Sequence, residues 1–544
     1  MIDGLNNKTF LFSRPFLAGM VSAAVALSVG ELFSSVTNRT TSLVYAVGEF
    51  IIDITPGDVV RGSIETLGNY QKVVLLCSIA LLSIIFGGIL GVLSRKHSEK
   101  SYLLFIGFGI FGAWALNRDP LTTTSAALSL SVSATLIGIS SLLFLNSLLN
   151  EKEEEEEHVE DPRNTYANRR QFINWATGMT VAAGTLTGVG RVLLRDDTVR
   201  NIRENIVLPD VKEGNDLLTN ESIPKETPLA STTTTPSGGG DLLSFSEMNE
   251  IEGISPYITS NEDFYRIDTA LRVPTIEPSN WTLRVDGLVG NPYEISYDEI
   301  LKMDLVKKNV TLTCVSNEIG GPLVGNAVWT GVPLDQIVSK AEPLATSEQI
   351  MCHSVDGFTA GFPLENIFDG RTALLAVGMN GAPLPIIHGF PARLVVAGLY
   401  GYVSAVKWIK RIELCTWDDN DGYWIPRGWS KRAPIKISSR IDVPQKRKIE
   451  SGMHVVAGVA WAPLSGIKKV EVSFNSGPWK ECDLGLSLSG ESWTQWVYKW
   501  EAEPGKYEIK VRATDKNGVI QSSNIVSPAP NGAEGLDKIS IRVV

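Results

Sequence analysis

Long apolar runs are confined to the first 195 residues of the chain, whereas the remainder alternates between apolar and polar positions on a shorter scale. A helix that crosses a bilayer needs about 20 predominantly apolar residues. Five segments have this pattern, and the third of them is short: 16–36, 73–93, 102–116, 126–149 and 172–190. We therefore predict a membrane domain of four transmembrane helices in residues 1–150. An acidic cytoplasmic linker and a fifth transmembrane helix follow in residues 151–195.

The basic residues around these segments predict their orientation, because Lys and Arg concentrate in cytoplasmic loops. They precede the first span, follow the second and precede the fifth, so all share one side if the amino terminus is cytoplasmic. Five spans then place everything after Arg191 outside the cytoplasm. Asn168-Arg169-Arg170-Gln171-Phe172-Ile173 resembles a twin-arginine export signal, although an arginine pair before a helix also serves as a simple cytoplasmic anchor. Both interpretations predict a multi-pass protein of the cell membrane with extracytoplasmic globular domains.

Three further regions follow the last predicted span. Residues 196–250 are polar and rich in Ser, Thr and Gly, a composition typical of a flexible tether. Residues 251–440 mix alternating runs, such as 281–285, with helical patches at 297–303 and 334–341, and they predict an α+β domain. Residues 441–544 contain only short alternating strands separated by Gly, Pro, Asn and Asp turns. That pattern is typical of an immunoglobulin-like β-sandwich.

Composition narrows the classes of function. A formal net charge of −11 gives no support to nucleic-acid binding. Of the five cysteines, no two have zinc-ligand spacing, and a lone cysteine most often packs as a small core residue. None of the five histidines lies in a predicted span, so we expect no haem in this chain and a separate electron-transfer partner.

Three separated motifs carry a specific resemblance. The first runs from Thr311 through Cys314 to Asn317 and continues as Ala327-Val-Trp-Thr-Gly-Val-Pro-Leu334. The second is Asn380-Gly-Ala-Pro-Leu-Pro385 followed by His388-Gly-Phe-Pro-Ala-Arg393, and the third is Gly398-Leu-Tyr-Gly401 before Val406-Lys-Trp408. Together they resemble the sulfite-oxidase family of molybdenum enzymes, over about residues 255–544. The later strands resemble that family's dimerisation-type sandwich domain, in which the many tryptophans serve either the core or an interface.

The resemblance implies a molybdenum–molybdopterin cofactor with Cys314 as its metal ligand and catalytic centre. Sulfur is a donor that molybdenum accepts, and an arginine fork suits the phosphate of the pterin tail. The residues implied in cofactor binding are Asn261, Phe264, Tyr265, Cys314, Asn317, His388, Arg393, Ser404 and Lys407. Arg266 is the nearest match to the family's substrate arginine. The neighbours Cys352 and His353 point to opposite faces of a predicted strand, so we do not expect them to form a nucleophilic pair.

The sequence departs from the family at the positions that handle sulfite. Phe264-Tyr265 is followed by Arg266-Ile267-Asp268 where the animal and plant enzymes have V-R-N-H, and Glu318 and Ile319 replace an arginine pair. In these respects the chain is similar to the bacterial methionine-sulfoxide reductase branch. We therefore predict oxygen-atom transfer that reduces a small S-oxide or N-oxide. The alternatives are oxidation of sulfite or a related oxyanion, and a non-catalytic binding or assembly module. The expected partners are a quinol-linked protein or a cytochrome, the membrane and a second copy of the chain.

Overall fold

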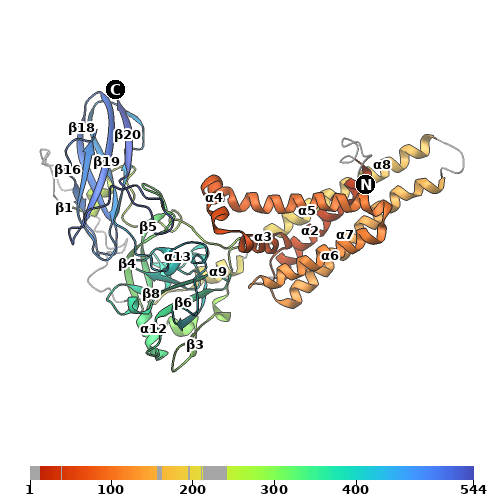
Figure 1. Cartoon of the computed structure of the whole chain (residues 1–544), viewed down its shortest axis with the longest axis horizontal. Coiled ribbons are helices and arrows are strands. Elements are labelled where there is room, and N and C mark those ends of the chain that lie inside the picture. Colours follow the sequence, from red (N-terminus) through yellow and green to blue (C-terminus); the bar gives the residue numbers. More distant parts are fainter. Residues whose placement is uncertain (1–12, 38–39, 156–161, 194–196, 210, 212–241) are drawn as a thin grey trace. The chain divides into compact units, whose positions relative to one another are not determined.

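The computed structural model describes residues 13–37, 40–155, 162–193, 197–209, 211 and 242–544 (Figure 1). These residues fall into two compact units. The first ends at Asp197 and also includes the short segment Ala270–Pro274, and the second comprises the rest of the chain to Val544. The first unit is helical, whereas the second consists mainly of β-sheets.

Helices occupy each of the five apolar segments that the sequence predicts to be spans. They are α2 (Arg14–Thr37), α5 (Gln71–Lys96), α6 (Ser98–Arg118), α7 (Thr124–Glu155) and α8 (Pro162–Leu193), and the shorter helices α3 (Leu43–Ile54) and α4 (Gly57–Leu67) lie between α2 and α5 in the sequence. Three of the described helices are long and apolar enough to cross a membrane, namely α2, α5 and the part of α7 from Thr124 to Leu149. The segments of α6 and α8 are helical as predicted.

Small residues bring two of these helices into close contact. A Cβ atom added at Gly87 of α5 would lie 2.4 Å from the Cβ of Ala23 in α2 and 2.7 Å from the carbonyl oxygen of Gly19. Only glycine allows the two backbones to approach this closely, which is the usual way in which apolar helices pack when no water drives them together.

Two sheets form the first half of the second unit. One has the order β10-β8-β5-β4, with β9 paired to β8, and the other has the order β3-β2-β11-β6-β7. The strands are β2 (Thr282–Gly287), β3 (Tyr293–Ser296), β4 (Val306–Thr313), β5 (Val324–Pro333), β6 (Gln349–Ser354), β7 (Thr359–Pro363), β8 (Ala373–Met379), β9 (Ala382–Pro383), β10 (Arg393–Val396) and β11 (Ile409–Cys415). The short helices are α11 (Tyr297–Ile300), α12 (Leu334–Lys340) and α13 (Gly401–Ser404). The predicted strand near residue 283 and both predicted helical patches are confirmed.

The β10-β8-β5-β4 sheet is buried on both faces. One face shares a core with the other sheet, where Leu283, Val332 and Leu375 are fully buried. The opposite face packs Trp329 and Val310 against Phe264. Because continuous apolar strands such as β8 can face core on both sides, this sheet is a rigid platform for the loops that leave its ends.

The last hundred residues, joined by the short strand β1 (Leu242–Leu243), form two further five-stranded sheets, β1-β17-β18-β14-β12 and β13-β20-β19-β15-β16. Their strands are β12 (Ser438–Val443), β13 (Lys448–Ile449), β14 (Gly452–Trp461), β15 (Ile467–Phe474), β16 (Lys480–Glu481), β17 (Asp483–Gly485), β18 (Thr494–Ala502), β19 (Gly505–Asp515) and β20 (Lys538–Val543). Val456, Val470, Trp496 and Ile509 lie in one core that both sheets share. The tryptophans at 461, 493, 496 and 500 are all buried within the chain, so they serve the core.

The segment expected to be a tether differs from that expectation at both ends. Helix α9 (Asp197–Asn205) buries Val199 against the core that contains Phe264, and Arg203 donates hydrogen bonds to the carbonyl oxygens of Pro383 and Leu384. Further on, β1 (Leu242–Leu243) pairs with β17, and α10 (Phe245–Asn249) is capped by Ser244. A few apolar residues at helical spacing anchor these two ends. The polar average composition of the segment gave no indication of them. Residues 212–241 lie outside the described residues.

The contact of Arg203 yields a first prediction. Replacing Arg203 by Ala leaves two partly buried carbonyl oxygens without their charged donor, so we expect the free energy of unfolding of the second unit to fall by about 1–2 kcal/mol. Denaturant unfolding of the full chain, followed by tryptophan fluorescence, measures this loss. Arg200→Ala is the matched control, because Arg200 lies exposed on the same helix. Equal effects of the two substitutions would contradict the prediction.

Candidate functional site

Cys314 follows directly after β4 and is buried, with 7% of its surface exposed. Its N–H donates to the carbonyl oxygen of Leu323 at 3.0 Å, and its own carbonyl accepts from the N–H of Asn317. Burial raises the pKa of the thiol, while hydrogen bonds from the backbone and side chain of Ser316 oppose that shift. The sulfur therefore lies on a fixed turn next to donors that favour its thiolate form.

The loop from His388 to Arg393 supplies a buried positive charge. Gly389 has a φ of +112°, and a Cβ atom there would lie 3.0 Å from the Cβ of Arg393 and 3.1 Å from the Cβ of Lys407. This left-handed glycine lets the two cationic residues approach the same turn. Arg393 is 5% exposed, donates to the carbonyl oxygens of His388, Leu394 and Ala405, and stacks its guanidinium over Trp329.

An aromatic and amide cluster covers the other side of His388. The Nε2–H of His388 donates to the carbonyl oxygen of Asn261 at 3.0 Å, and the ring of Phe264 meets the imidazole edge to face at 5.6 Å. Phe264 also stacks on Tyr265 at 5.2 Å. Burial, and then the charge of Arg393, lower the pKa of His388 to about 4, so the imidazole is neutral at pH 7.

A second charged group lies beside this cluster. The carboxylate of Asp268, whose side chain is 4% exposed, accepts from Lys407 Nζ at 2.6 Å and from Arg266 Nε at 2.8 Å. Burial lowers the pKa of Lys407 to about 8, and the charge of Asp268 opposes this shift. Burial also raises the pKa of Asp356, and the nearby Asp268 adds to that shift. Two cations and two carboxyl groups are therefore gathered at one place.

These residues fit an anionic cofactor that bonds to a thiolate. Among the described residues, the Arg393 guanidinium donates its hydrogen bonds to backbone carbonyls and none to a carboxylate, so its charge has no balancing partner there. Burial lowers its pKa to about 10. The hydroxyl of Thr313, next to Cys314, is buried and has no hydrogen-bond partner in that same part. A buried cation and an unsatisfied hydroxyl beside a thiol are the features that such a cofactor would complete.

The described residues contain no metal site built from side chains alone. Within the described ranges, no three His, Cys, Asp or Glu side chains gather at metal-binding distances. A metal bound through Cys314 would therefore take its remaining ligands from a cofactor.

Comparisons with known proteins agree with this interpretation. Residues 270–424 match the model of the oxidoreductase molybdopterin-binding domain. Mitochondrial sulfite oxidase of Mus musculus is 28% identical over 319 residues, which cover 49% of this chain and 58% of that protein. The uncharacterized oxidoreductase YuiH of Bacillus subtilis is 33% identical over 154 residues, which cover 28% of this chain and 74% of YuiH.

The chain belongs to the sulfite-oxidase family of molybdopterin-dependent oxidoreductases. Among solved structures, the sulfane dehydrogenase SoxCD of Paracoccus pantotrophus has 21% identity and a TM-score of 0.47, covering 54% of this chain and 82% of that one. The chain spans a little over half of the length of the mammalian sulfite oxidases that it matches. Family membership makes it an enzyme, so the alternative of a non-catalytic binding module does not hold.

The structure brings most of the predicted site residues together in this family member. Asn261, Phe264 and His388 are in direct contact, and Tyr265 lies close enough to Cys314 and Arg393 for their charges to affect its pKa, which burial raises. Two predicted residues hold the backbone instead. The hydroxyl of Ser404 in α13 donates to the carbonyl oxygens of Leu399 and Tyr400 just before that helix, and the amide oxygen of Asn317 accepts from the N–H of Leu323.

Sequence reasoning missed two residues of this site. Asp268 joins Lys407 to Arg266, and Trp329 lies beneath the guanidinium of Arg393. A buried lysine needs an acidic partner, so the prediction of Lys407 as a site residue was itself a signal to search for one. The position of Trp329 depends on strand pairing and has no comparable local signal.

The prediction for Cys352 and His353 is confirmed. Cys352 is fully buried in β6, whereas His353 Nε2 bonds to Glu413 at 2.9 Å on the half-exposed face of the same strand. The two side chains therefore do not form a nucleophilic pair.

The low pKa of His388 predicts how stability depends on pH. Between about pH 6.5 and 4 the unfolded chain binds a proton at this histidine that the folded chain does not, so stability falls as the pH falls through that window. We expect wild type to lose about 1–2 kcal/mol more than His388→Gln on going from pH 7 to pH 5. Denaturant unfolding of both proteins at the two pH values measures this difference. Equal losses would show that His388 titrates normally in the folded chain.

Proposed function

We propose that this family member is a reductase anchored to the cell membrane. It removes the oxygen atom of a small, uncharged S-oxide or N-oxide and releases it as water. The observation that carries the proposal is the ion pairing of Asp268, which engages both Arg266 and Lys407. The proposal concerns the substrate class and the direction of the reaction.

The charges around Arg266 favour an uncharged substrate. An oxyanion such as sulfite would need unpaired positive charge at its binding site. Arg266 is the candidate for that role, and its guanidinium is already within 2.8 Å of Asp268. Lys407 pairs with the same carboxylate, so both cations already have an acidic partner before any substrate arrives. A neutral substrate loses nothing in such a pocket, whereas an anion would have to displace Asp268.

Cofactor binding is proposed through the residues with unbalanced charge or sulfur chemistry. Cys314 would hold the metal and Arg393 the phosphate of the pterin tail, Lys407 would donate a hydrogen bond to the pterin, and the free Nδ1 of the neutral His388 would accept one. When bound, the molybdenum centre supplies oxygen-atom transfer with the exchange of two electrons. The protein contributes binding, orientation and a neutral His388 that accepts a hydrogen bond without changing the charge of the pocket.

Sulfite oxidation is the second candidate, because mitochondrial sulfite oxidase is among the relatives of the chain. That reaction produces electrons, whereas reduction of an S-oxide consumes them, so the direction can be read with artificial donors and acceptors. Reduced viologen should support turnover of an S-oxide. Robust reduction of ferricyanide with sulfite, abolished by Arg266→Ala, would reverse the assignment.

The proposal also places the chain in a membrane. The three apolar helices α2, α5 and α7 favour a membrane location. We propose that α6 and α8 complete five spans, that Arg169 and Arg170 form part of a twin-arginine signal, and that the second unit functions outside the cytoplasm. The last two sheets are proposed to be an immunoglobulin-like domain through which two copies of the chain associate.

Cys314 provides the test of cofactor attachment. We expect Cys314→Ser to retain less than a tenth of the molybdenum of wild type, because a hydroxyl is a poorer donor than a thiolate to this metal. Metal analysis of purified protein measures the loss. Cys352→Ser is the matched control, since Cys352 is buried in the same part of the chain but lies away from the site. Wild-type molybdenum content in Cys314→Ser would contradict the proposed ligand.

Asp268 provides the test of substrate class. Asp268→Asn removes the charge that offsets Arg266 and Lys407, so we expect sulfite or sulfate to inhibit S-oxide reduction about tenfold more strongly. Inhibition constants measured with reduced viologen as donor give the ratio. Asp263→Asn makes the same change of charge at an exposed position of the same segment and should leave inhibition unchanged. Equal inhibition of all three proteins would contradict a charge-balanced pocket.

A further inference from the structure

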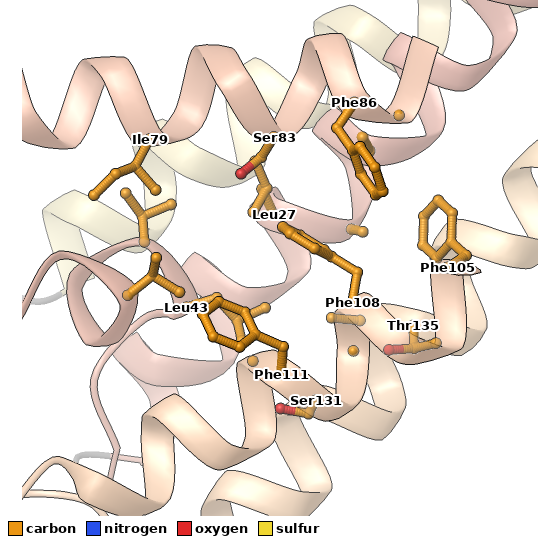
Figure 2. Close-up of a pocket in the computed structure, with 18 of the residues that line it drawn as sticks. Leu27, Leu43, Ile79, Ser83, Phe86, Phe105, Phe108, Phe111, Ser131 and Thr135 are labelled. Atoms are coloured by element: carbon orange, nitrogen blue, oxygen red, sulfur yellow. The ribbon is translucent and has the colours of Figure 1, made fainter. Parts of the chain in front are cut away.

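A small pocket lies beside the turn that holds Cys314, and its walls are mostly polar. It contrasts with the cleft among the helices of the first unit, where side chains such as Leu27, Phe86 and Phe108 make the walls mainly apolar (Figure 2). The polar residues that line the pocket beside Cys314 are Thr313, Asn317, Glu318, Tyr400, Lys436 and Ser438. Its volume is about 10 Å³, which is room for one group the size of a water molecule. A pocket of this size and chemistry suits a single polar atom of a ligand.

Two hydroxyl groups in this pocket have no hydrogen-bond acceptor among the described residues. The side chain of Thr313 is buried, and its hydroxyl neither donates nor accepts a hydrogen bond there. Tyr400 is 4% exposed, and its oxygen accepts only a long hydrogen bond of 3.5 Å from the N–H of Lys436. The buried hydroxyls of Tyr297 and Thr330 lack partners as well, but neither of them lines this pocket. A buried donor without an acceptor is costly, so Thr313 and Tyr400 are two donors available to a ligand atom.

The backbone around Tyr400 fixes the position of its hydroxyl. Tyr400 comes directly before α13, and its N–H donates to the carbonyl oxygen of Ala433 at 2.8 Å. Gly532, in the loop before β20, has a φ of +90°, and a Cβ atom there would overlap the Tyr400 hydroxyl. Burial raises the pKa of Tyr400 to about 12, and Cys314 and Glu534 lie close enough to add to that shift. The hydroxyl is therefore held near the sulfur of Cys314 and keeps its proton at neutral pH.

The lysine of this pocket already has a carboxylate partner. Lys436 Nζ forms an ion pair with Glu534, and both side chains are more than two-thirds buried. The pocket therefore presents neutral hydroxyl donors to a ligand rather than free positive charge. The oxygen of an S-oxide or N-oxide has a strong partial negative charge and accepts hydrogen bonds from such donors. An oxyanion such as sulfite would lack the charged donors that bind it most strongly.

We propose that Tyr400 and Thr313 recognise the oxygen atom of the S-oxide or N-oxide by donating one hydrogen bond each to it. The inference rests on the proposed function and deepens it, because it names the groups that bind the reacting oxygen. Two donors that meet on one oxygen fix its direction as well as its position.

The roles of Tyr400 and Thr313 are to bind and to orient. In the reaction the S–O or N–O bond breaks, two electrons and two protons are taken up, and the oxygen leaves as water. An external donor supplies the electrons and the solvent supplies the protons, so both hydroxyls keep their own protons throughout.

Replacing Tyr400 by Phe tests the inference, because it removes one donor and keeps the ring. We expect kcat/KM for reduction of methyl phenyl sulfoxide, with reduced viologen as donor, to fall about tenfold to a hundredfold, while the molybdenum content stays that of wild type. Methyl phenyl sulfone serves as an unreactive analogue that reports binding alone. Isothermal titration calorimetry with the purified full chain should give a dissociation constant about fivefold to tenfold higher in Tyr400→Phe. Thr313→Val, which keeps the shape of the side chain, should have effects in the same direction.

Tyr402→Phe is the matched control, because it removes a nearby hydroxyl of α13 that already donates to the carbonyl oxygen of Ser430. It should leave turnover and sulfone affinity unchanged. Equal values in wild type and Tyr400→Phe, or no binding of the sulfone to wild type, would overturn the inference. A wild type that binds the sulfone but reduces no sulfoxide would instead count against the proposed function, and the sulfone affinities would still decide the role of Tyr400.

Discussion

A positive charge that is buried without a carboxylate partner among the described residues is the constraint on which the site depends. Taking a guanidinium out of water costs several kcal/mol unless its charge is balanced. Arg393 meets this cost only in part, through carbonyl oxygens and the face of Trp329. The β10-β8-β5-β4 sheet, buried on both faces, provides the rigidity that holds it there, and Gly389 gives the adjoining turn its shape. The arrangement is explained if an anionic cofactor supplies the missing charge.

The neighbouring charges have the opposite arrangement. Asp268 lies between Arg266 and Lys407, so both cations in this part of the pocket already have a carboxylate partner. The contrast separates two tasks. In our proposal, the unpartnered charge of Arg393 holds the cofactor, and the pairing of Asp268 with Arg266 and Lys407 selects a neutral substrate. Under this proposal, the segment that departs from the family pattern, Arg266-Ile267-Asp268, also contains the residue that selects the substrate class.

Much of this organisation could be predicted from the sequence, because it depends on local pattern. The apolar runs predict the helices, alternation predicts β2 and the strands of the last two sheets, and the motifs around Cys314, His388 and Lys407 predict which loops meet. The rest depends on contacts between distant residues. Helix α9 is short and polar on average, yet Val199 and Arg203 attach it to the second unit. The partner of Lys407 is 139 residues away in the sequence, and no local pattern identifies it.

The most direct measurement of the central claim is the increase in unfolding temperature that the cofactor gives. Full-length wild type and Arg393→Met would each be purified with and without molybdopterin, from cells able or unable to make it. A ligand that binds only the folded state raises the stability of the protein, and it does so more the tighter it binds. The account predicts an increase of several degrees in wild type and little or none in Arg393→Met, and comparing increments cancels any direct effect of the substitution. Equal increments in the two proteins would contradict the claim that Arg393 is buried to bind the cofactor.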